Sequence, residues 1–225
     1  MDGSRRDFMQ HVTLGSVGLS GALAWSGSMA DLEAAALLQA GATWDVSWAE
    51  KLKAKHKAVM DCVEAESGIG VWRAGAWASQ VADVFKAPPS DITAVIVLRH
   101  EAIALAMSQA FWDKYAVNAD KKITHPLTEQ PTDKNPILLD ERDGIPAPFN
   151  NMSLPKQQNR GAVVLACNLA LRSMVGLVQK ADSVSEDEAH KRAVAGLIPG
   201  VILQPSGVFA AVRGQQAGCA YVRVS

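Results

Sequence analysis

The sequence predicts a single α/β domain with a mainly parallel, five-stranded sheet and helices on both of its faces. Apolar runs such as Ile92–Leu98 and Ala162–Ala166 are typical of strands that are buried on both faces, as in parallel sheets. Segments with helical spacing alternate with these runs, and such alternation implies parallel strands joined by crossover helices. The chain has 225 residues, of which 48% are hydrophobic and 20% charged. This is enough material for one core.

The first half of the domain is expected to follow the order strand, helix, strand, helix. His56–Glu64 has strand character and is followed by a glycine-containing turn. Val71–Phe85 is predicted to be a helix that ends before Pro88-Pro89. Ile92–Leu98 is the second strand, and Ala102–Tyr115 carries apolar residues at helical spacing.

Residues 118–151 break this alternation. The stretch is rich in charged residues and shows no sustained period, and its prolines are Pro126, Pro131, Pro136, Pro146 and Pro148. We expect a long surface insertion that serves either as a lid or as an oligomer contact.

The second half continues the pattern and is expected to end in a strand. Pro155 suits the first turn of a helix that Ser153 caps, and Ser185 opens a later helix as a capping box with Glu188. The expected elements are a helix at 153–160, a strand at 162–166, helices at 169–181 and 185–197, a strand at 201–205, a helix at 208–217 and a strand at 219–224.

The N-terminus has the three parts of a secretory signal. Ser4-Arg5-Arg6-Asp7-Phe8 resembles the twin-arginine pattern, a mildly apolar stretch follows to Gly27, and Ser28-Met29-Ala30 is a small-x-small cleavage site. The alternative is an irregular start that contains two arginines by chance. We therefore expect a signal peptide at 1–30, a helical segment at 31–55, the α/β domain at 56–225 and a periplasmic location.

Composition and motifs exclude several classes of function. A formal net charge of -1 gives no reason to expect a nucleic-acid partner. No apolar run approaches the ~20 residues of a transmembrane helix. The chain contains 3 cysteines, which argues against a disulfide scaffold. Without a C-x-x-C, H-E-x-x-H, Walker or dinucleotide motif, we expect no metal and no cofactor.

Cys167 is the first candidate for chemistry. It follows the apolar run Ala162–Ala166 and precedes a helical stretch, so it is expected where a strand ends and a helix begins. Ligands of open α/β sheets bind at the carboxyl ends of the strands. The free N–H groups of a helix N-terminus also favour a thiolate. The alternative is a small buried hydrophobic residue, the commonest role of a free cysteine.

Other candidates follow neighbouring strands. His100 is a candidate base, and its neighbours Arg99 and Glu101 could bind an anion or pair with each other. Asn168, Ser206 and Gly207 follow strand ends and are candidate ligand-binding residues. For each of them a structural role is the alternative: a hydrogen-bonding histidine, a helix cap or a plain turn.

The remaining cysteines and histidines are expected to have structural roles. Cys62 and Cys219 are interpreted as packing residues. His56 and His125 lack metal-ligand spacing to any partner, and His190 lies on a polar helix.

Residues 161–224 resemble the DsrE/DsrF-like sulfur-relay family. The resemblance is carried by the strand-Ala-Cys167-Asn-helix pattern, Pro199-Gly200-Val201, Gly207-Val208 and Gly218-Cys219-Ala220-Tyr221. It implies a small five-stranded α/β sheet, assembly as trimers or hexamers, and, in some members, a cysteine that accepts sulfane sulfur as a persulfide. The first half matches only in its alternation of strands and helices.

Two functional hypotheses result. The first is an exported DsrE-like protein that handles sulfane sulfur or a reactive thiol ligand through Cys167. The second is a non-catalytic protein of the cell envelope that binds a small ligand or serves in assembly. We also expect a homo-oligomer, because an open sheet leaves edges and helix faces that need cover, and the resemblance implies a trimer or a hexamer. The alternative is a monomer whose insertion folds back over its own strand ends as a lid.

Overall fold

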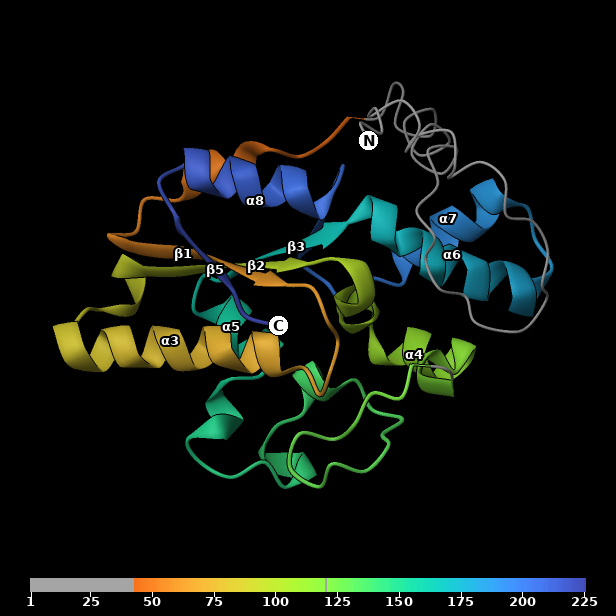
Figure 1. Ribbon diagram of the computed structural model, residues 1–225, viewed down its shortest axis with the longest axis horizontal. Helices are drawn as coiled ribbons and strands as arrows, with labels where there is room; N and C mark the ends of the chain where they lie inside the picture. The colour runs from red at the N-terminus through yellow and green to blue at the C-terminus, as the bar shows by residue number, and fades with distance from the viewer. Residues whose placement is uncertain (1–42, 120) are drawn as a thin grey trace, which may run out of the picture. The chain divides into compact units, whose positions relative to one another are not determined.

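Five parallel strands form one sheet in the computed structural model, which describes residues 43–119 and 121–225 (Figure 1). The strands are β1 (His56–Cys62), β2 (Ile92–Leu98), β3 (Val163–Cys167), β4 (Val201–Gln204) and β5 (Ala220–Arg223). Their order across the sheet is β4-β3-β2-β1-β5, and every pair is parallel. The predicted α/β class and the parallel five-stranded sheet are confirmed.

The described chain begins with a segment attached to the sheet. The signal peptide predicted at 1–30 and the first part of the segment at 31–55 lie outside the described residues. Within residues 43–55 a short 3₁₀ helix, η1 (Ser47–Lys51), carries the buried Trp48. The indole N–H of Trp48 donates to Oε1 of Gln204 at 3.1 Å, so this segment is held at the carboxyl end of β4.

Successive residues of the strands face two separate cores because side chains alternate across a sheet. One core contains Val59, Val95, Val97 and Leu165 of the strands, with Trp48 and Ala210. The other contains Met60, Ile96, Leu98 and Val164 of the strands, with Val71 and Ala74. Figure 1 shows α8 (Gly207–Gln216) on one side of the sheet and α3 (Ile69–Phe85) on the other. The sheet is therefore covered by helices on both faces.

The strand order creates a switch point between β3 and β4. Strands β1 to β4 lie side by side in the order in which they occur in the chain. The chain then passes back across the sheet through α8, so that β5 lies beside β1. After β3 the chain enters α6 (Asn168–Asp182), whose buried residues join the core of α3. After β4 it enters α8 in the opposite core. Adjacent strands whose helices leave to opposite faces mark the usual ligand position of such sheets.

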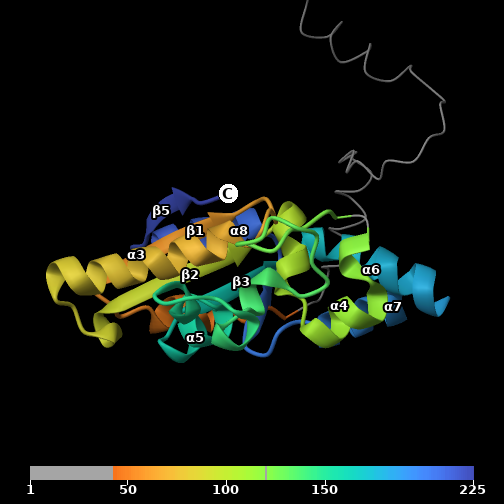
Figure 2. The ribbon, with the colours of Figure 1, turned by 90° about the horizontal axis from the view of Figure 1, so that it is seen from below.

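A group of helices lies beyond the carboxyl ends of the strands. It contains η3 (His100–Ala106), α4 (Gln109–Tyr115), α6 and α7 (Glu186–Ala195). Figure 2 shows α4, α6 and α7 together beside one end of the sheet, as in Figure 1. Ser185 caps α7 by accepting a hydrogen bond from the N–H of Glu188, which is one half of the predicted capping box. The predicted cap at Ser153 is wrong, because its side chain makes no cap hydrogen bond.

The prediction of a single helix at Ala102–Tyr115 is wrong. The segment forms the 3₁₀ helix η3 and the separate helix α4, and Met107 between them is extended. Tertiary hydrogen bonds replace the helical ones here. Met107 forms an antiparallel bridge with Leu197, and the N–H of Ser108 donates to the carbonyl of Gly196 at 2.8 Å.

The stretch between α4 and α5 (Leu154–Asn159) contains four short 3₁₀ helices and an isolated antiparallel bridge between Thr124 and Pro131 among its described residues. The helices are η4 (Val117–Ala119), η5 (Pro136–Leu138), η6 (Glu141–Asp143) and η7 (Phe149–Asn151). Asn135 anchors the stretch because its fully buried Nδ2 donates to the carbonyls of Leu105 and Met107, both at 2.8 Å. Leu139 and Ile145 pack against Trp72 of α3.

No helix within residues 43–119 and 121–225 has the length and apolar character that crossing a membrane requires.

Replacing Asn135 with alanine should destabilise the protein by about 2–6 kcal/mol, because two buried carbonyls lose their donor at about 1–3 kcal/mol each. Urea denaturation followed by circular dichroism measures the change, and Gln130→Ala is the matched control because Gln130 is exposed in the same stretch. A loss below about 0.5 kcal/mol, the range of neutral surface changes, would show that Asn135 does not anchor this stretch.

Candidate functional site

The predicted site residues all lie at the carboxyl ends of three adjacent strands. Arg99, His100 and Glu101 follow β2, Cys167 and Asn168 end β3 and begin α6, and Ser206 and Gly207 begin α8 after β4. Since these strands are neighbours in the order β4-β3-β2, one edge of the sheet carries every candidate.

Cys167 occupies the junction that the sequence predicts. It is the last residue of β3, lies opposite Gln204 of β4, and is the N-cap of α6. Its Sγ accepts a hydrogen bond from the N–H of Ala170 at 3.4 Å. The residue is 6% exposed, and its thiol is free. The thiol therefore faces the first turn of α6 and has little contact with solvent.

His190, for which the sequence predicts no role in the site, contacts the residue that follows Cys167 in the chain. Nε2 of His190 in α7 is 2.9 Å from Oδ1 of Asn168, the residue after Cys167, and Asn168 is buried. The pairing joins positions 22 residues apart and depends on how α7 packs on α6. No spacing rule in the sequence signals it.

Asp61 is the central buried charge of this edge. The carboxylate is 1% exposed and accepts two hydrogen bonds from Arg99, from Nε at 2.8 Å and from Nη2 at 2.9 Å. The phenol of Tyr221 in β5 donates to Oδ2 of Asp61 at 2.6 Å. Asp61 is the one acidic residue within β1. A charged residue inside a buried strand was the signal in the sequence that could have identified it.

The hydrogen bonds to Asp61 shift the pKa values of both of its partners, Arg99 and Tyr221. The hydrogen bond to Asp61 raises the pKa of Arg99, and the pair with Asp61 holds the guanidinium in one orientation. The hydrogen bond to Asp61 likewise raises the pKa of Tyr221, because an ionised phenolate would face a carboxylate.

Arg99 and Gly207 are in close contact. A Cβ atom at Gly207 would lie 2.5 Å from both Cβ and Cδ of Arg99, so only glycine permits this approach of α8 to β2. Ser206 is the N-cap of α8, and its Oγ accepts from the N–H of Phe209 at 3.0 Å. The hydroxyl of Ser206 therefore has a structural role as a cap.

His100 faces the β1 side of the edge. Its backbone is in the left-handed region with φ of 50°, which is uncommon for residues other than glycine. Its Nδ1 lies 4.0 Å from Oε2 of Glu64. Glu101 is exposed. The structure thus places His100 with Glu64, whereas Cys167 lies with Ala170 and Asn168.

The other two cysteines lie in the two cores. Cys62 ends β1 and is fully buried in the core of α3, and burial raises the pKa of its thiol. Cys219 packs in the core of α8, where burial also raises the pKa of its thiol. A raised thiol pKa disfavours the reactive thiolate, so both positions suit packing residues. Among the described residues no group of three or more His, Cys, Asp or Glu side chains could hold a metal ion.

Comparison of the chain with family models, with curated proteins and with solved structures gave no match.

The phenol of Tyr221 should titrate above its ordinary value of 10.0, and Asp61→Asn should lower its pKa toward that value. Because the pKa of Tyr221 is raised in the folded state, the protonated phenol contributes to the free energy of unfolding. This contribution is fully present below pH 10 and is lost as pH rises through the folded-state pKa. Tyrosinate absorbance in a Tyr115→Phe background reports Tyr221 alone, since the chain has 2 tyrosines. A Tyr221 pKa at or below the ordinary value would contradict the hydrogen bond to Asp61.

Proposed function

We propose that this protein is an exported, DsrE-like protein that accepts sulfane sulfur, or binds a reactive thiol ligand, at Cys167. The observation that carries the proposal is the position of Cys167 at the switch point, between the N-terminus of α6 and that of α8. The resemblance of residues 161–224 to DsrE/DsrF-like proteins supports the same chemistry, and the twin-arginine pattern at Ser4–Phe8 supports a periplasmic location.

The proposed transfer requires no external oxidant. The Cys167 thiolate attacks the outer sulfur of a persulfide donor, a new S–S bond forms on Cys167, and the S–S bond of the donor breaks. The donor leaves as a thiolate, so atoms and electrons balance. The main-chain N–H of Ala170, 3.4 Å from Sγ, is a donor that a sulfur anion at this position can use.

A non-catalytic binding protein is the second candidate, and the burial of Cys167 favours it. At 6% exposure, the thiol resembles a packing residue more than an accessible nucleophile. In this case the edge that carries Arg99, His100 and Cys167 would hold a small ligand without reacting, since ligands of such sheets bind at the carboxyl ends of the strands.

Incubation with glutathione persulfide should add the mass of one sulfur atom to the wild-type protein, and Cys167→Ser should abolish the addition. Cys219→Ser is the matched control, since Cys219 is also buried and free, and it should retain the adduct. Intact-protein mass spectrometry measures the product. A wild type without an adduct would reject the transfer. Noncovalent binding of the donor with unaltered affinity in Cys167→Ser would support the second candidate.

The proposal includes a homo-oligomer, a trimer or a hexamer, assembled through α8 and β5. Val208 and Val212 of α8 are 63% and 48% exposed, and Val222 of β5 is 44% exposed. All four residues of β5 are exposed on an edge strand, which leaves unpaired backbone groups. Neighbouring exposed apolar side chains of this kind are typical of interaction surfaces.

The double substitution Val208→Glu/Val212→Glu should convert the oligomer to single chains, because it would bury like charges at the proposed contact. Val84→Glu is the matched control, since Val84 is equally apolar and 70% exposed at the end of α3, and it should leave the mass unchanged. Multi-angle light scattering at micromolar concentration measures both. A monodisperse wild-type monomer would reject the assembly.

The same measurement tests whether the insertion at 118–151 lies at a subunit contact. Deletion is a poor probe, because Asn135 and Ile137 are fully buried against the rest of the domain. Leu127 is 50% exposed in the insertion, so Leu127→Glu changes its surface without removing core residues. Loss of the oligomer in this variant would place the insertion at the contact, and an unchanged mass would place it elsewhere.

A further inference from the structure

The C-terminal end of α3 carries two of the most exposed large apolar side chains in the described part of the chain. Val84 is 70% exposed and Phe85 is 63% exposed. Figure 1 and Figure 2 both show this end of α3, in yellow, on the far side of the sheet from α4, α6 and α7. Those helices lie beyond the carboxyl ends of the strands, so Val84 and Phe85 lie at the amino edge, away from Cys167.

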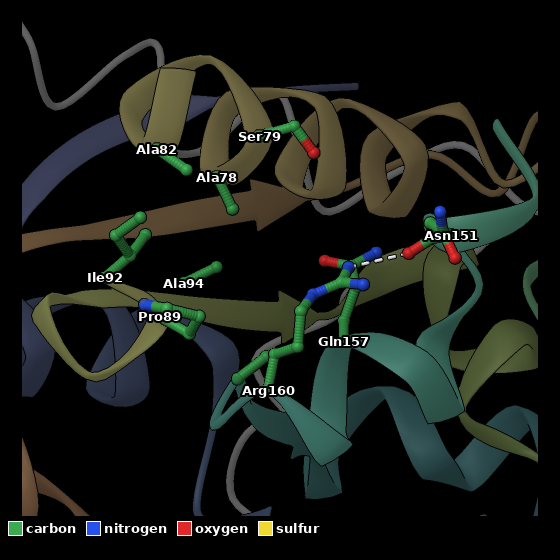
Figure 3. Close-up of a pocket in the computed structure, with 10 residues that line it drawn as sticks. Ala78, Ser79, Ala82, Pro89, Ile92, Ala94, Asn151, Gln157 and Arg160 are labelled. Carbon is green, nitrogen blue, oxygen red and sulfur yellow. Dashed lines mark hydrogen bonds between the residues drawn. The ribbon is translucent and has the colours of Figure 1, made fainter. Parts of the chain in front are cut away.

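Phe85 continues the buried stripe of α3 past the end of the sheet. The residues of this stripe recur at helical spacing, and they are Val71, Ala74, Ala78, Val81 and Phe85. Figure 3 shows Ala78 and its neighbour Ala82 pointing toward the first residues of β2, where they line a cavity of about 330 Å³. Val81 is 7% exposed, whereas Phe85, one turn later, is largely exposed. The apolar face of α3 therefore extends beyond the sheet that covers the rest of it.

The position of Phe85 is fixed by the start of β1. Its ring stacks on the ring of His56, with centroids 5.0 Å apart and an angle of 17° between the planes. His56 is the first residue of β1. Lys86 ends the helix with a left-handed backbone, and two exposed prolines follow at 88 and 89. Val84 and Phe85 thus form a defined projection, here called the apolar tip.

Exposed lysines lie next to the apolar tip in the fold. The stack on His56 brings the preceding extended segment, with Lys53 and Lys55, to the end of α3. Both lysines are exposed, while the alternate residues Leu52 and Ala54 are buried. The two ammonium groups therefore face solvent on the same side of an extended segment.

Acidic residues at this edge are fewer than basic ones. Asp83 pairs with Lys86 at 3.0 Å, and Asp91 is half-buried before β2. Lys53 and Lys55 are exposed, and so is Arg160 at the cavity of Figure 3. The surface around the apolar tip is thus cationic in a chain whose formal net charge is -1.

We propose that the apolar tip docks the protein on an anionic lipid surface. Val84 and Phe85 enter the boundary between headgroups and acyl chains, and Lys53 and Lys55 face the anionic headgroups. Apolar side chains that enter this boundary, together with lysines that meet negative headgroups, are the two contributions that hold peripheral proteins on such membranes. Docking by the amino edge turns the carboxyl edge, which carries Cys167, away from the lipid.

The chemistry of the apolar tip favours a lipid surface over a protein partner. Lysine is depleted at protein interfaces, and a stable interface buries about 800 Å² of each partner. The tip instead consists of two side chains at the end of one helix, with lysines beside them. A lipid surface accommodates such a projection without a shape that is complementary to it.

Co-sedimentation with vesicles tests the docking, using the full chain and vesicles of phosphatidylcholine alone or with an equal part of phosphatidylglycerol. We expect binding to the mixed vesicles. Val84→Ser/Phe85→Ser should weaken it at least about tenfold, because less apolar surface leaves water. Lys53→Gln/Lys55→Gln should weaken it about fivefold for each lysine removed. Raising the salt from about 0.1 M to about 1 M should also weaken it, because the Debye length falls from about 10 Å to about 3 Å.

The matched controls replace exposed residues of the same types elsewhere. They are Phe149→Ser, since Phe149 is 47% exposed, and Lys180→Gln/Lys191→Gln on α6 and α7. Both should bind as the wild type does, and thermal unfolding verifies that every variant is folded. Absence of binding to the mixed vesicles would overturn the docking, and so would wild-type affinity in Val84→Ser/Phe85→Ser. Equal binding to phosphatidylcholine alone would overturn the anionic class of lipid.

A fluorescent label locates the contact within the chain. Val84→Cys labelled with nitrobenzoxadiazole should shift its emission to shorter wavelength on the mixed vesicles, whereas labelled Phe149→Cys should not. The native cysteines are buried, so the introduced thiol is the accessible one. An unchanged emission at Val84 would overturn the docking even where the chain sediments with the vesicles. Cys167 takes no part in this contact, so the result is independent of the sulfur-transfer test.

Discussion

The arrangement of residues at the carboxyl edge of the sheet depends on the hydrogen bonds of one buried carboxylate, that of Asp61. A charge that is 1% exposed is costly unless it is paired and hydrogen-bonded, and Asp61 obtains its partners from β2 and β5 on its two sides. The pair fixes the stem of Arg99 where Gly207 can pack on it. The start of α8, and with it one side of the switch point, is therefore positioned by a charge in β1.

Most polar groups at the carboxyl edge are engaged within the fold. Ser206 caps α8, Arg99 binds Asp61, and Asn168 contacts His190. These contacts hold the residues around Cys167 in a defined environment.

Features that depend on local signals could be predicted from the sequence, and features that depend on packing could not. Ile92–Leu98 is identified by its apolar run, and Cys167 by its place between a strand and a helix. The break at Met107 was missed because it depends on Leu197 and on the buried amide of Asn135, which lie far along the chain. His190 was missed for the same reason, and for Asp61 the sequence shows only a charge within a buried strand, not the partners of that charge. Their partners, Asn168, Arg99 and Tyr221, become neighbours only when the helices and strands pack.

The burial of Cys167 limits the reactions that suit it. Its Sγ contacts the first turn of α6, and the residue is packed in the core that also contains α3. A bulky electrophile would have to displace this packing, which in a close-packed interior costs free energy. Transfer of a sulfane sulfur requires only one atom of the donor to reach Sγ, while the rest of the donor remains outside at the switch point. Of the thiol reactions open to this residue, a one-atom transfer thus demands the least rearrangement of the fold.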